Sequence, residues 1–387
     1  FETYGGWSWW TKNDTDNAVK RFMDAAWKYG MKCIVNDAKI QETLNLGRDT
    51  VSSSELASLK TSVQSSISSR ILHSNSSETN LQTLMFHPGF YGFNVPDEPF
   101  YDSKTMYAIG YASQTIKQIY DNNPAFAGRF RPVIHTCLLP YAKYVFDTDN
   151  QYQTYLKQWL DLTGLNYFSF DLYNYTTSNY GTYSSISSKQ FCPIKSSYTI
   201  FQTLRSQYPG LKISQTINSG NIIGQQDQTT EDIFACHLAT AAMKFNGYGL
   251  FTFSPFDYSG EWENEALTVK LEKTSYYPLL QEANRQVVAL KGMLDGYDIT
   301  SANFDQNPTN GYGSGVKKMT ISYSNGSNEK QMIVNYETDK SASSTFKVTV
   351  PSNKTYILFG HNQDINNLLT GTGSSITINK GIGILIF

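Results

Sequence analysis

The sequence predicts a mixed α/β protein: a (β/α)8 TIM barrel followed by an antiparallel β-sandwich. Up to about residue 294, short apolar runs that are typical of buried strands alternate with longer segments of helical period. Beyond that point the helical segments stop, and short strand-like runs alternate with turns rich in Asn, Gly and Ser. A length of 387 residues accommodates a barrel of about 250 to 300 residues with a small second domain. We therefore expect a barrel domain at 1–295 and a β-sandwich domain at 296–387.

Seven strands are predicted in the barrel region, where a closed barrel of this class has eight. We expect the missing first strand to lie upstream of this chain. The alternatives are an eighth strand within LQTLMFH, at 81–87, or an incomplete barrel. The predicted strands are YGGWSWW (4–10), KCIVND (32–37), FYGFNVP (90–96), RPVIHTCLL (131–139), NYFSFDLY (166–173), KISQTIN (212–218) and YGLFTFS (248–254).

A helix is predicted after each of these strands. The first is the best defined, because its apolar residues share one face between about 16 and 29 and Gly30 then ends it. The others are predicted near 53–72, 103–121, 151–163, 196–207, 229–245 and 266–294. The strands predicted for the second domain are VKKMTISYS, KQMIVNYE, STFKVTV, KTYILFG, SSITI and GILIF.

Composition and charge narrow the classes of ligand. The formal net charge is -2, from 31 basic and 33 acidic residues, and no long basic run exists, so nucleic acid is not expected as a partner. No apolar stretch approaches the roughly 20 residues that a membrane span requires. The chain has 27 Tyr, 22 Phe and 6 Trp, yet only 17% of its residues are charged. We assign most of these rings to the core, but the balance suits a neutral ligand such as a carbohydrate.

The cysteines and glycosylation sequons bear on cofactors and location. Cys33, Cys137, Cys192 and Cys236 lie far apart without a CxxC or Cys/His spacing, so we expect no structural zinc, no metal and no organic cofactor. Buried free thiols are the expectation, and a disulfide that includes Cys192 remains open. Five N-x-[ST] tripeptides are glycosylation acceptors if the protein is secreted from a eukaryote, at Asn13, Asn75, Asn174, Asn325 and Asn353.

The sharpest candidate site follows the predicted strand at 90–96. In VPDEP, at 95–99, two adjacent acids lie between prolines, and neighbouring carboxylates raise the pKa of one of them, as a general acid requires. The alternative is that Asp97 and Glu98 are acids favoured by the N-terminus of the next helix. Because barrel active sites form at the carboxyl ends of the strands, other polar residues there are candidates as well.

The segment HPGFYGFNVPDEP (87–99) resembles the fourth strand of clan A glycoside hydrolases, specifically the group with D-E-P in place of N-E-P. The resemblance covers roughly 1–295 and implies that Glu98 is the general acid/base, with Asp97 at the clan's Asn position. FSFDLYNY (168–175) resembles the sixth strand, which implies that Asp171 and Tyr173 lie at the floor of the site. ISQTI (213–217) resembles the seventh strand, where the clan has a nucleophilic Glu and this chain has Gln215.

A glycosidase needs a second carboxylate beside its general acid. Because Gln215 is an amide and cannot act as the nucleophile, this second carboxylate must come from another residue. Asp171 is the first choice, and Asp37 and Asp257 are the alternatives by the same position at strand ends. The Trp residues of WSWW face alternate sides, so at least one of them is expected in the core. The residues expected to contact substrate are Trp9, Trp10, Asp37, Asp97, His135, Tyr173, Gln215 and Asp257.

The resemblance implies hydrolysis of O-glycosidic bonds in a poly- or oligosaccharide, with carbohydrate as the partner and an extracellular or cell-surface location. Gln215 also permits a non-catalytic carbohydrate-binding or structural protein that keeps the barrel. A third alternative is assembly into an extracellular polymer through the strand edges of the second domain. Ser hydrolase, zinc protease and nucleotide-binding motifs are absent from the sequence.

Overall fold

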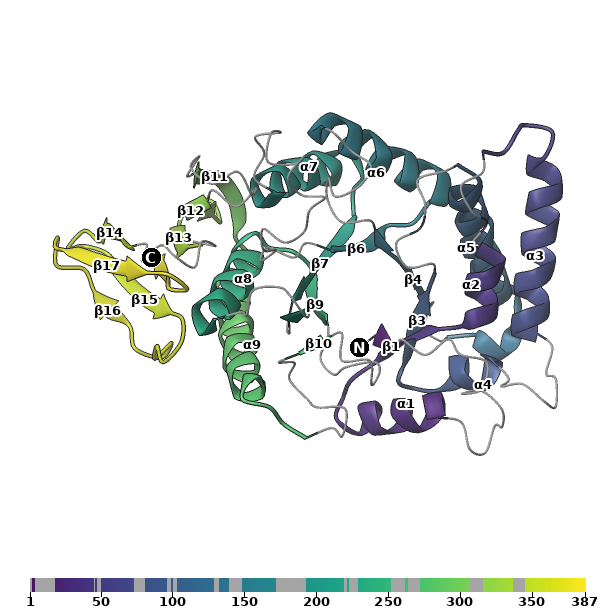
Figure 1. Ribbon diagram of the computed structural model, residues 1–387, viewed down its shortest axis with the longest axis horizontal. Helices are drawn as coiled ribbons and strands as arrows, with labels where there is room; N and C mark the ends of the chain where they lie inside the picture. The colour runs from purple at the N-terminus through teal and green to yellow at the C-terminus, as the bar shows by residue number, and fades with distance from the viewer. Residues whose placement is uncertain are drawn as a thin grey trace. The chain divides into compact units, whose positions relative to one another are not determined.

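The computed structural model shows a mixed α/β protein with a parallel-strand part and an antiparallel sheet (Figure 1). The chain forms two compact units, each made of three segments. The first unit consists of Phe1–Pro140, Asn150–Phe170 and Leu204–Lys212. The second unit consists of Tyr141–Asp149, Asp171–Thr203 and Ile213–Phe387. The predicted boundary between 295 and 296 stays a prediction. The structure describes residues 2–3, 18–44, 46, 50–72, 81–95, 99, 103–128, 132–138, 148–171, 193–218, 221–222, 229–251, 262–263, 272–306, 316–336 and 345–387.

The first unit is built on parallel strands. β1 (Glu2–Thr3), β2 (Cys33–Asn36), β3 (Phe90–Asn94) and β4 (Val133–His135) are neighbours in this order, and each pairing is parallel. The segment predicted as one strand, RPVIHTCLL, contains two short strands, β4 and β5 (Cys137–Leu138), which are separated by Thr136. β5 pairs in parallel with β6 (Tyr167–Asp171). Parallel pairing of short strands separated by helices agrees with the βα repeats predicted from the sequence.

Helices follow the strands, and two of them were not predicted as helices. The segment considered for an eighth strand, 81–87, forms helix α4 instead, with Leu84 and Met85 buried, so that alternative is wrong. Helix α2 begins directly after β2 because the carboxylate of Asp37 accepts the backbone N–H of Ile40 and caps it. The helices are α1 (Ala18–Lys28), α2 (Ala38–Leu44), α3 (Leu56–Leu72), α4 (Leu81–Phe86), α5 (Ser103–Asn122), α6 (Asp149–Thr163) and α7 (Pro193–Gln207).

Close packing fixes the helices of the first unit against each other and against the sheet. Gly110 of α5 lies against the carbonyl of Leu162 in α6, where a Cβ atom would collide with the backbone. Trp159 of α6 is fully buried and meets the ring of Phe168 in β6 edge-on, with 5.9 Å between ring centroids. These contacts hold the strands rigidly from the helix side.

The second unit contains the parallel pair β7 (Lys212–Asn218) and β9 (Gly247–Phe251). A short antiparallel pair, β8 (Asn221–Ile222) with β10 (Trp262–Glu263), is an addition to the predicted elements. Helix α8 (Thr230–Ala242) starts with a capping box formed by Thr229 and Asp232, and α9 is Tyr276–Met293. The helix predicted at 266–294 therefore starts later than expected.

The antiparallel sheet contains every strand predicted for the second domain except those at 345–349 and 375–379, which pair with each other. Its order is β11-β12-β13-β18-β15-β16, and β14 pairs with β17. The sheet also contains two strands that were not predicted, β11 and β16. The strands are β11 (Asp298–Gln306), β12 (Val316–Ser324), β13 (Glu329–Asn335), β14 (Thr345–Thr349), β15 (Thr355–Phe359), β16 (Leu369–Thr370), β17 (Ser375–Asn379) and β18 (Gly383–Ile386).

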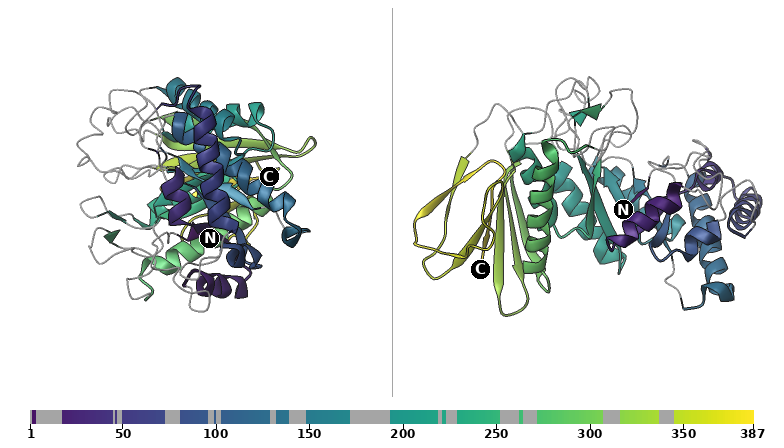
Figure 2. Two further views of the ribbon diagram at one scale, coloured as in Figure 1. Left: turned by 90° about the vertical axis from the view of Figure 1, so that its right-hand side faces the viewer. Right: turned by 90° about the horizontal axis from the view of Figure 1, so that it is seen from below.

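The sheet packs directly against α8 and α9 (Figure 2). The hydroxyl of Tyr323 in β12 donates to the carbonyl of Ala242 at 2.6 Å, and Lys380 forms an ion pair with Asp232 at 2.7 Å. Both contacts are buried or nearly so on the side of α8. Helix α8 is thus joined to β12 of the sheet and to the turn between β17 and β18 by side-chain contacts.

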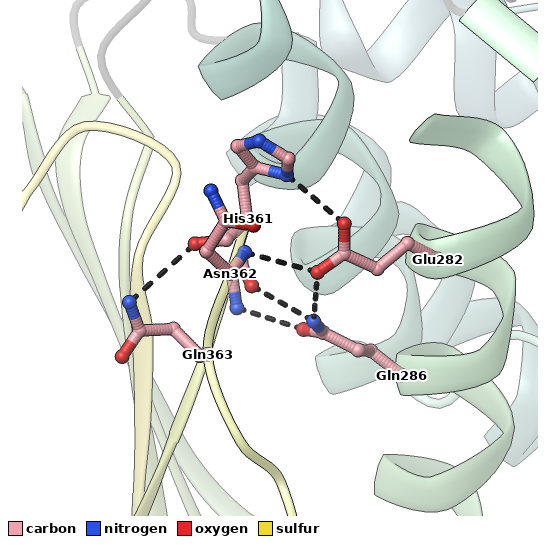
Figure 3. A network of polar contacts seen from close by, with 6 residues as sticks. Glu282, Gln286, His361, Asn362 and Gln363 are labelled. Atoms are coloured by element: carbon pink, nitrogen blue, oxygen red, sulfur yellow. Dashed lines mark hydrogen bonds and ion pairs between the residues drawn. The ribbon is translucent and has the colours of Figure 1, made fainter. Parts of the chain in front are cut away.

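A polar network joins α9 to the turn after β15 (Figure 3). Nε2 of Gln286 donates to the carbonyl of Gly360 at 2.8 Å, and Oε1 of Gln286 accepts the N–H of Gly360 at 2.7 Å. Glu282, one turn earlier, accepts from His361 at 2.9 Å and from the N–H of Asn362 at 3.0 Å. Gly360 has φ +136, a conformation that other residues rarely adopt, so only Gly suits this turn.

Cys33 and Cys236 are buried free thiols, as predicted. In the described part of the chain, no helix is long and apolar enough to cross a membrane. The same residues contain no group of three or more His, Cys, Asp or Glu side chains arranged to hold a metal ion.

Candidate functional site

The structure places some of the candidate residues and leaves others undescribed. Asp37, His135 and Gln215 are described with their side chains. Asp171 is the last residue of β6, and its side chain is not described. The remaining candidates lie outside the described residues, namely Trp9, Trp10, Asp97, Glu98, Tyr173 and Asp257.

Three polar residues form a row at the carboxyl ends of adjacent strands, and we call Asn36, Asn94 and His135 the strand-end row. Asn36 of β2 is in register with Asn94 of β3, which is in register with His135 of β4. Each is the last residue of its strand. Residues in register in a parallel sheet project from the same face, so the three side chains lie on one side.

The row one residue earlier is apolar. Val35, Phe93 and Ile134 are in register across the same three strands, and all are buried. Because side chains alternate along a strand, this apolar row projects from the opposite face to the strand-end row. The sheet therefore has one face that packs in the core and another that becomes polar where the strands end.

Asn94 and His135 are bonded to each other. Nδ1 of His135 lies 3.0 Å from Oδ1 of Asn94, and both side chains are buried, with exposed fractions of 3% and 0%. The imidazole also lies against the ring of Tyr167 in β6, at 4.9 Å between centroids. Among the described residues, Nδ2 of Asn94 has no hydrogen-bond partner. A buried amide donor without a partner is uncommon in folded proteins and calls for an explanation.

The backbone pairing between β3 and β4 continues for one residue beyond Asn94, in the segment that leads to the acidic pair. The N–H of Val95 donates to the carbonyl of His135 at 2.8 Å, so the chain remains paired to β4 one residue beyond β3. Val95 is fully buried. Asp97 and Glu98 come two and three residues later in the sequence.

Asp37, at the end of β2, is held by structural partners. Arg70 of α3 binds its carboxylate through Nη2 at 2.7 Å and through Nε at 3.2 Å, and the N–H of Ile40 adds a bond at 3.0 Å. The pair is almost completely buried, with side-chain exposures of 9% for Arg70 and 5% for Asp37. The neighbouring Asn36 accepts from the side chain of Gln41 in α2. These contacts fix α2 and α3 against the strand end and balance the charge of Asp37.

Gln215 of β7 is directed at helix α8. Its Oε1 accepts from the hydroxyl of Thr240 at 3.1 Å, and its side chain is completely buried. Alternation places it on the same face as Ile213 and Ile217 and opposite Ser214. The described contacts thus give Gln215 a place between sheet and helix, and its predicted contact with substrate stays a prediction.

A buried histidine lies on α8, the helix to which Gln215 is bonded. His237 of α8 donates from Nδ1 to the carbonyl of Ile233 at 2.7 Å, and its ring meets Tyr248 edge-on at 5.2 Å. Tyr248 is the neighbour of Gln215 across β7 and β9. Burial lowers the pKa of His237 to about 4, because the protonated ring would lose its hydration. Among the described residues, Nε2 of His237 has no hydrogen-bond partner.

Two residues that matter in this region were missed by sequence reasoning. Asn94 lies inside the segment that suggested the site, yet it was assigned to a strand without a role. Its signal was a polar residue at the end of an apolar strand. Arg70 carried no such signal, because it lies 33 residues from Asp37 on the next helix but one. Together the described strand-end groups offer amide and imidazole hydrogen-bonding atoms and a compensated ion pair, which suits hydroxyl groups.

Comparison with known proteins assigns no family. No protein-family model matches the chain, and no curated protein matches it. A conserved exported protein from Bacteroides fragilis is 12% identical over 96% of this chain and 79% of that one, with a TM-score of 0.47. A putative α-L-fucosidase from Bacteroides thetaiotaomicron is 11% identical over 71% and 72%, at 0.42. A GH42 β-galactosidase from G. stearothermophilus is 12% identical over 71% and 48%, at 0.40. Similarity at this level defines neither a fold family nor an activity for this chain.

Proposed function

We propose that the chain is an extracellular glycoside hydrolase on a (β/α) barrel, which cleaves O-glycosidic bonds in a neutral poly- or oligosaccharide. The observation that carries the proposal is the strand-end row, whose polar side chains lie in register at the carboxyl ends of three parallel strands. The acidic pair Asp97 and Glu98 follows Asn94 of this row within four residues. Carboxyl ends of parallel strands are where barrel enzymes place their chemistry.

In this proposal Glu98 is the general acid/base that protonates the leaving oxygen, and Asp171 is the second carboxylate. Asp257 is the alternative to Asp171. The role does not go to Asp37, because Arg70 and the N–H of Ile40 already engage its carboxylate. A retaining enzyme would hold the two catalytic carboxylates roughly 5 to 5.5 Å apart, and an inverting one roughly 6.5 to 9.5 Å apart.

Substrate binding in this proposal combines hydrogen bonds with stacking. His135 and Asp97 bind hydroxyl groups, and Trp9, Trp10 and Tyr173 offer rings for the faces of sugars. The charge balance next to the strand-end row supports a neutral glycan, since the carboxylate of Asp37 is paired with Arg70. An extracellular location is consistent with two exposed sequons, at Asn325 and Asn353.

The test is release of reducing ends from a panel of neutral polysaccharides. We expect turnover by the wild type and a fall of at least about 100-fold in kcat for Glu98→Gln, since general acid catalysis contributes about 10²- to 10⁴-fold. Asp171→Asn should cause a comparable fall. Glu42→Gln, an exposed residue of α2, is the matched control and should turn over normally. Full turnover by Glu98→Gln would refute the assignment.

A second candidate is a carbohydrate-binding protein that has kept the barrel without the chemistry. It is favoured by Gln215, which stands where the resemblance expects a nucleophilic Glu and which bonds to Thr240 of α8. In that case the wild type would be retarded by a neutral polysaccharide in affinity electrophoresis, would release no reducing ends, and Glu98→Gln would bind as the wild type does.

A further inference from the structure

The hairpin between β12 and β13 contains the dipeptide Asn325–Gly326 in an exposed loop. β12 ends at Ser324 and β13 begins at Glu329, so residues 325–328 connect the two strands, and all four are exposed. An asparagine can react with its own backbone, because the nitrogen of the next residue is able to attack the side-chain amide. A glycine in the next position favours this attack, since it has no side chain to obstruct it.

Both reacting groups of this dipeptide have hydrogen-bond partners that favour the attack. Oδ1 of Asn325 accepts the backbone N–H of Asn328 at 3.0 Å. This bond polarises the amide carbon Cγ, and it stabilises the negative charge that develops on Oδ1 during the attack. The attacking group, the backbone N–H of Gly326, donates to Oγ of Ser324 at 3.1 Å. Because Ser324 is partly exposed, its hydroxyl group can pass the proton of Gly326 to water.

The backbone around Gly326 has room to change its conformation. Gly326 has φ +96, and no atom of the described residues lies within 4 Å of the place where a Cβ atom would be. Closure of a five-membered ring requires rotation about the backbone bonds next to the reacting peptide unit. Since glycine adopts positive and negative φ at similar cost, this rotation is less hindered here than at other residues.

We propose that Asn325 is a site of spontaneous deamidation in the folded protein, promoted by Ser324 and by the backbone N–H of Asn328. The nitrogen of Gly326 forms a bond to Cγ of Asn325, and the bond between Cγ and Nδ2 breaks. Nδ2 leaves as ammonia, which carries the proton that Gly326 has lost, and a succinimide ring remains. Water then opens the ring at either carbonyl group, which gives aspartate or isoaspartate at this position.

The same dipeptide at Asn246–Gly247 is held in a way that opposes the reaction. Oδ1 of Asn246 also accepts a backbone N–H, that of Ile213 at 2.8 Å, so the difference lies in the main chain. The N–H of Asn246 donates to the carbonyl of Ile213 at 2.8 Å, and its carbonyl accepts from Nζ of Lys291 at 3.2 Å. Gly247 is the first residue of β9, which pairs with β7. Ring closure there requires local opening of the sheet. A third such dipeptide, at 310–311, lies outside the described residues.

Deamidation changes both the charge of the loop and its glycosylation sequon. Either product adds one negative charge, and isoaspartate also adds one carbon atom to the main chain. Because a glycan is attached through Nδ2 of the same side chain, the loss of this nitrogen removes Asn325 as an acceptor. Deamidation and glycosylation of Asn325 therefore exclude each other. This inference is independent of the proposed function.

The test compares the two dipeptides in the full chain, produced in a host without N-glycosylation. The folded protein is incubated at physiological temperature and pH, and its peptides are separated and analysed by mass spectrometry. We expect aspartate and isoaspartate to accumulate at Asn325 while Asn246 stays unmodified. In chain unfolded by urea, both positions should react at similar rates, because only the sequence then matters. An unmodified Asn325, or equal rates at the two positions in the folded protein, would overturn the proposal.

Three variants test the chemistry of the loop, at positions that are at least partly exposed, so that folding should be preserved. Ser324→Ala should slow deamidation by about two- to tenfold, the effect of one hydrogen bond on a rate. Asn325→Gln should abolish it, since the longer side chain cannot close a five-membered ring. Ser327→Ala is the matched control, because it removes another hydroxyl group of the loop and the sequon but should leave the rate unchanged. Equal rates in Ser324→Ala and Ser327→Ala would overturn the proposal.

Discussion

Two fully buried side-chain amides, Gln286 in the second unit and Asn94 in the first, have opposite surroundings. Both have an exposed fraction of 0%. Gln286 donates to and accepts from the backbone of Gly360 and donates also to Glu282 at 3.3 Å (Figure 3). Asn94 has one bond, to His135, and its Nδ2 has no partner among the described residues.

The difference separates a structural amide, Gln286, from one that is a candidate for a functional role, Asn94. Gln286 imitates a strand edge, because its two amide atoms pair with both backbone polar groups of one residue, Gly360, and hold the turn after β15 on α9. Asn94, at the carboxyl end of a strand, has a buried donor without a partner among the described residues. Since stability favours complete pairing, an incompletely paired group calls for an explanation other than stability. Three substitutions test this reading.

The largest loss of stability is expected for Gln286→Met, which preserves the shape of the side chain but removes the amide. The N–H of Gly360 would remain buried without its partner, at about 1 to 3 kcal/mol, and the carbonyl would keep the N–H of Gln363 but lose its bond to Gln286, at about 1 kcal/mol. We expect the free energy of unfolding to fall by about 2 to 4 kcal/mol, measured by urea denaturation followed by circular dichroism. Gln281→Met, an exposed position on the same helix, is the control and should change it by less than about 0.5 kcal/mol. Equal effects of the two variants would contradict the structural role of Gln286.

A pH-dependent loss of stability is expected from His237 of the second unit, whose Nε2 also has no hydrogen-bond partner among the described residues. Its pKa is about 4 in the folded state, because burial disfavours the charged ring, against 6.5 for an exposed His. Between these values the unfolded chain binds a proton and the folded chain does not, so stability falls as pH falls from about 6.5 to about 4. The full loss is about 3 kcal/mol, at 1.36 kcal/mol per pKa unit.

The measurement is the free energy of unfolding as a function of pH for the wild type and for His237→Asn. The variant keeps a donor near the carbonyl of Ile233 but does not titrate, so its curve should be flatter between pH 6.5 and 4 whatever its absolute stability. Parallel curves would show that other groups cause the acid sensitivity.

The periodic elements were the predictable part of the fold. The predicted helix at 103–121 is observed at Ser103–Asn122, because its apolar residues repeat at helical spacing and are buried along one face. Helix α2 could not be predicted as readily, since seven residues are too few for a period and its start depends on the capping bond of Asp37. Strand β11 was missed because its sequence, DITSANFDQ, contains few apolar residues. The segment forms a strand through its pairing with β12, which the sequence of the segment alone does not indicate.

The site was predictable in position but not in its contacts. Strand ends could be located from the sequence, and these led to Asp37 and His135. The partners of those residues, Arg70 and Asn94, come from chain segments 33 and 41 residues away, and such pairings depend on tertiary packing. The face of Gln215 could not be fixed either, since a shift of one residue in a strand exchanges the two faces.

The smallest change in stability is expected for Asn94→Leu, which completes the comparison with Gln286. The substitution removes a bond to His135, but it also removes a buried donor that has no partner in the described chain. His135 can move its proton to Nε2, so no unsatisfied N–H has to remain on Nδ1. We expect the free energy of unfolding to stay within about 1 kcal/mol of the wild type in the same urea titration. A loss as large as that of Gln286→Met would mean that Asn94 is retained for the fold, whereas a small one, together with lost turnover, would mean that it is retained for the site.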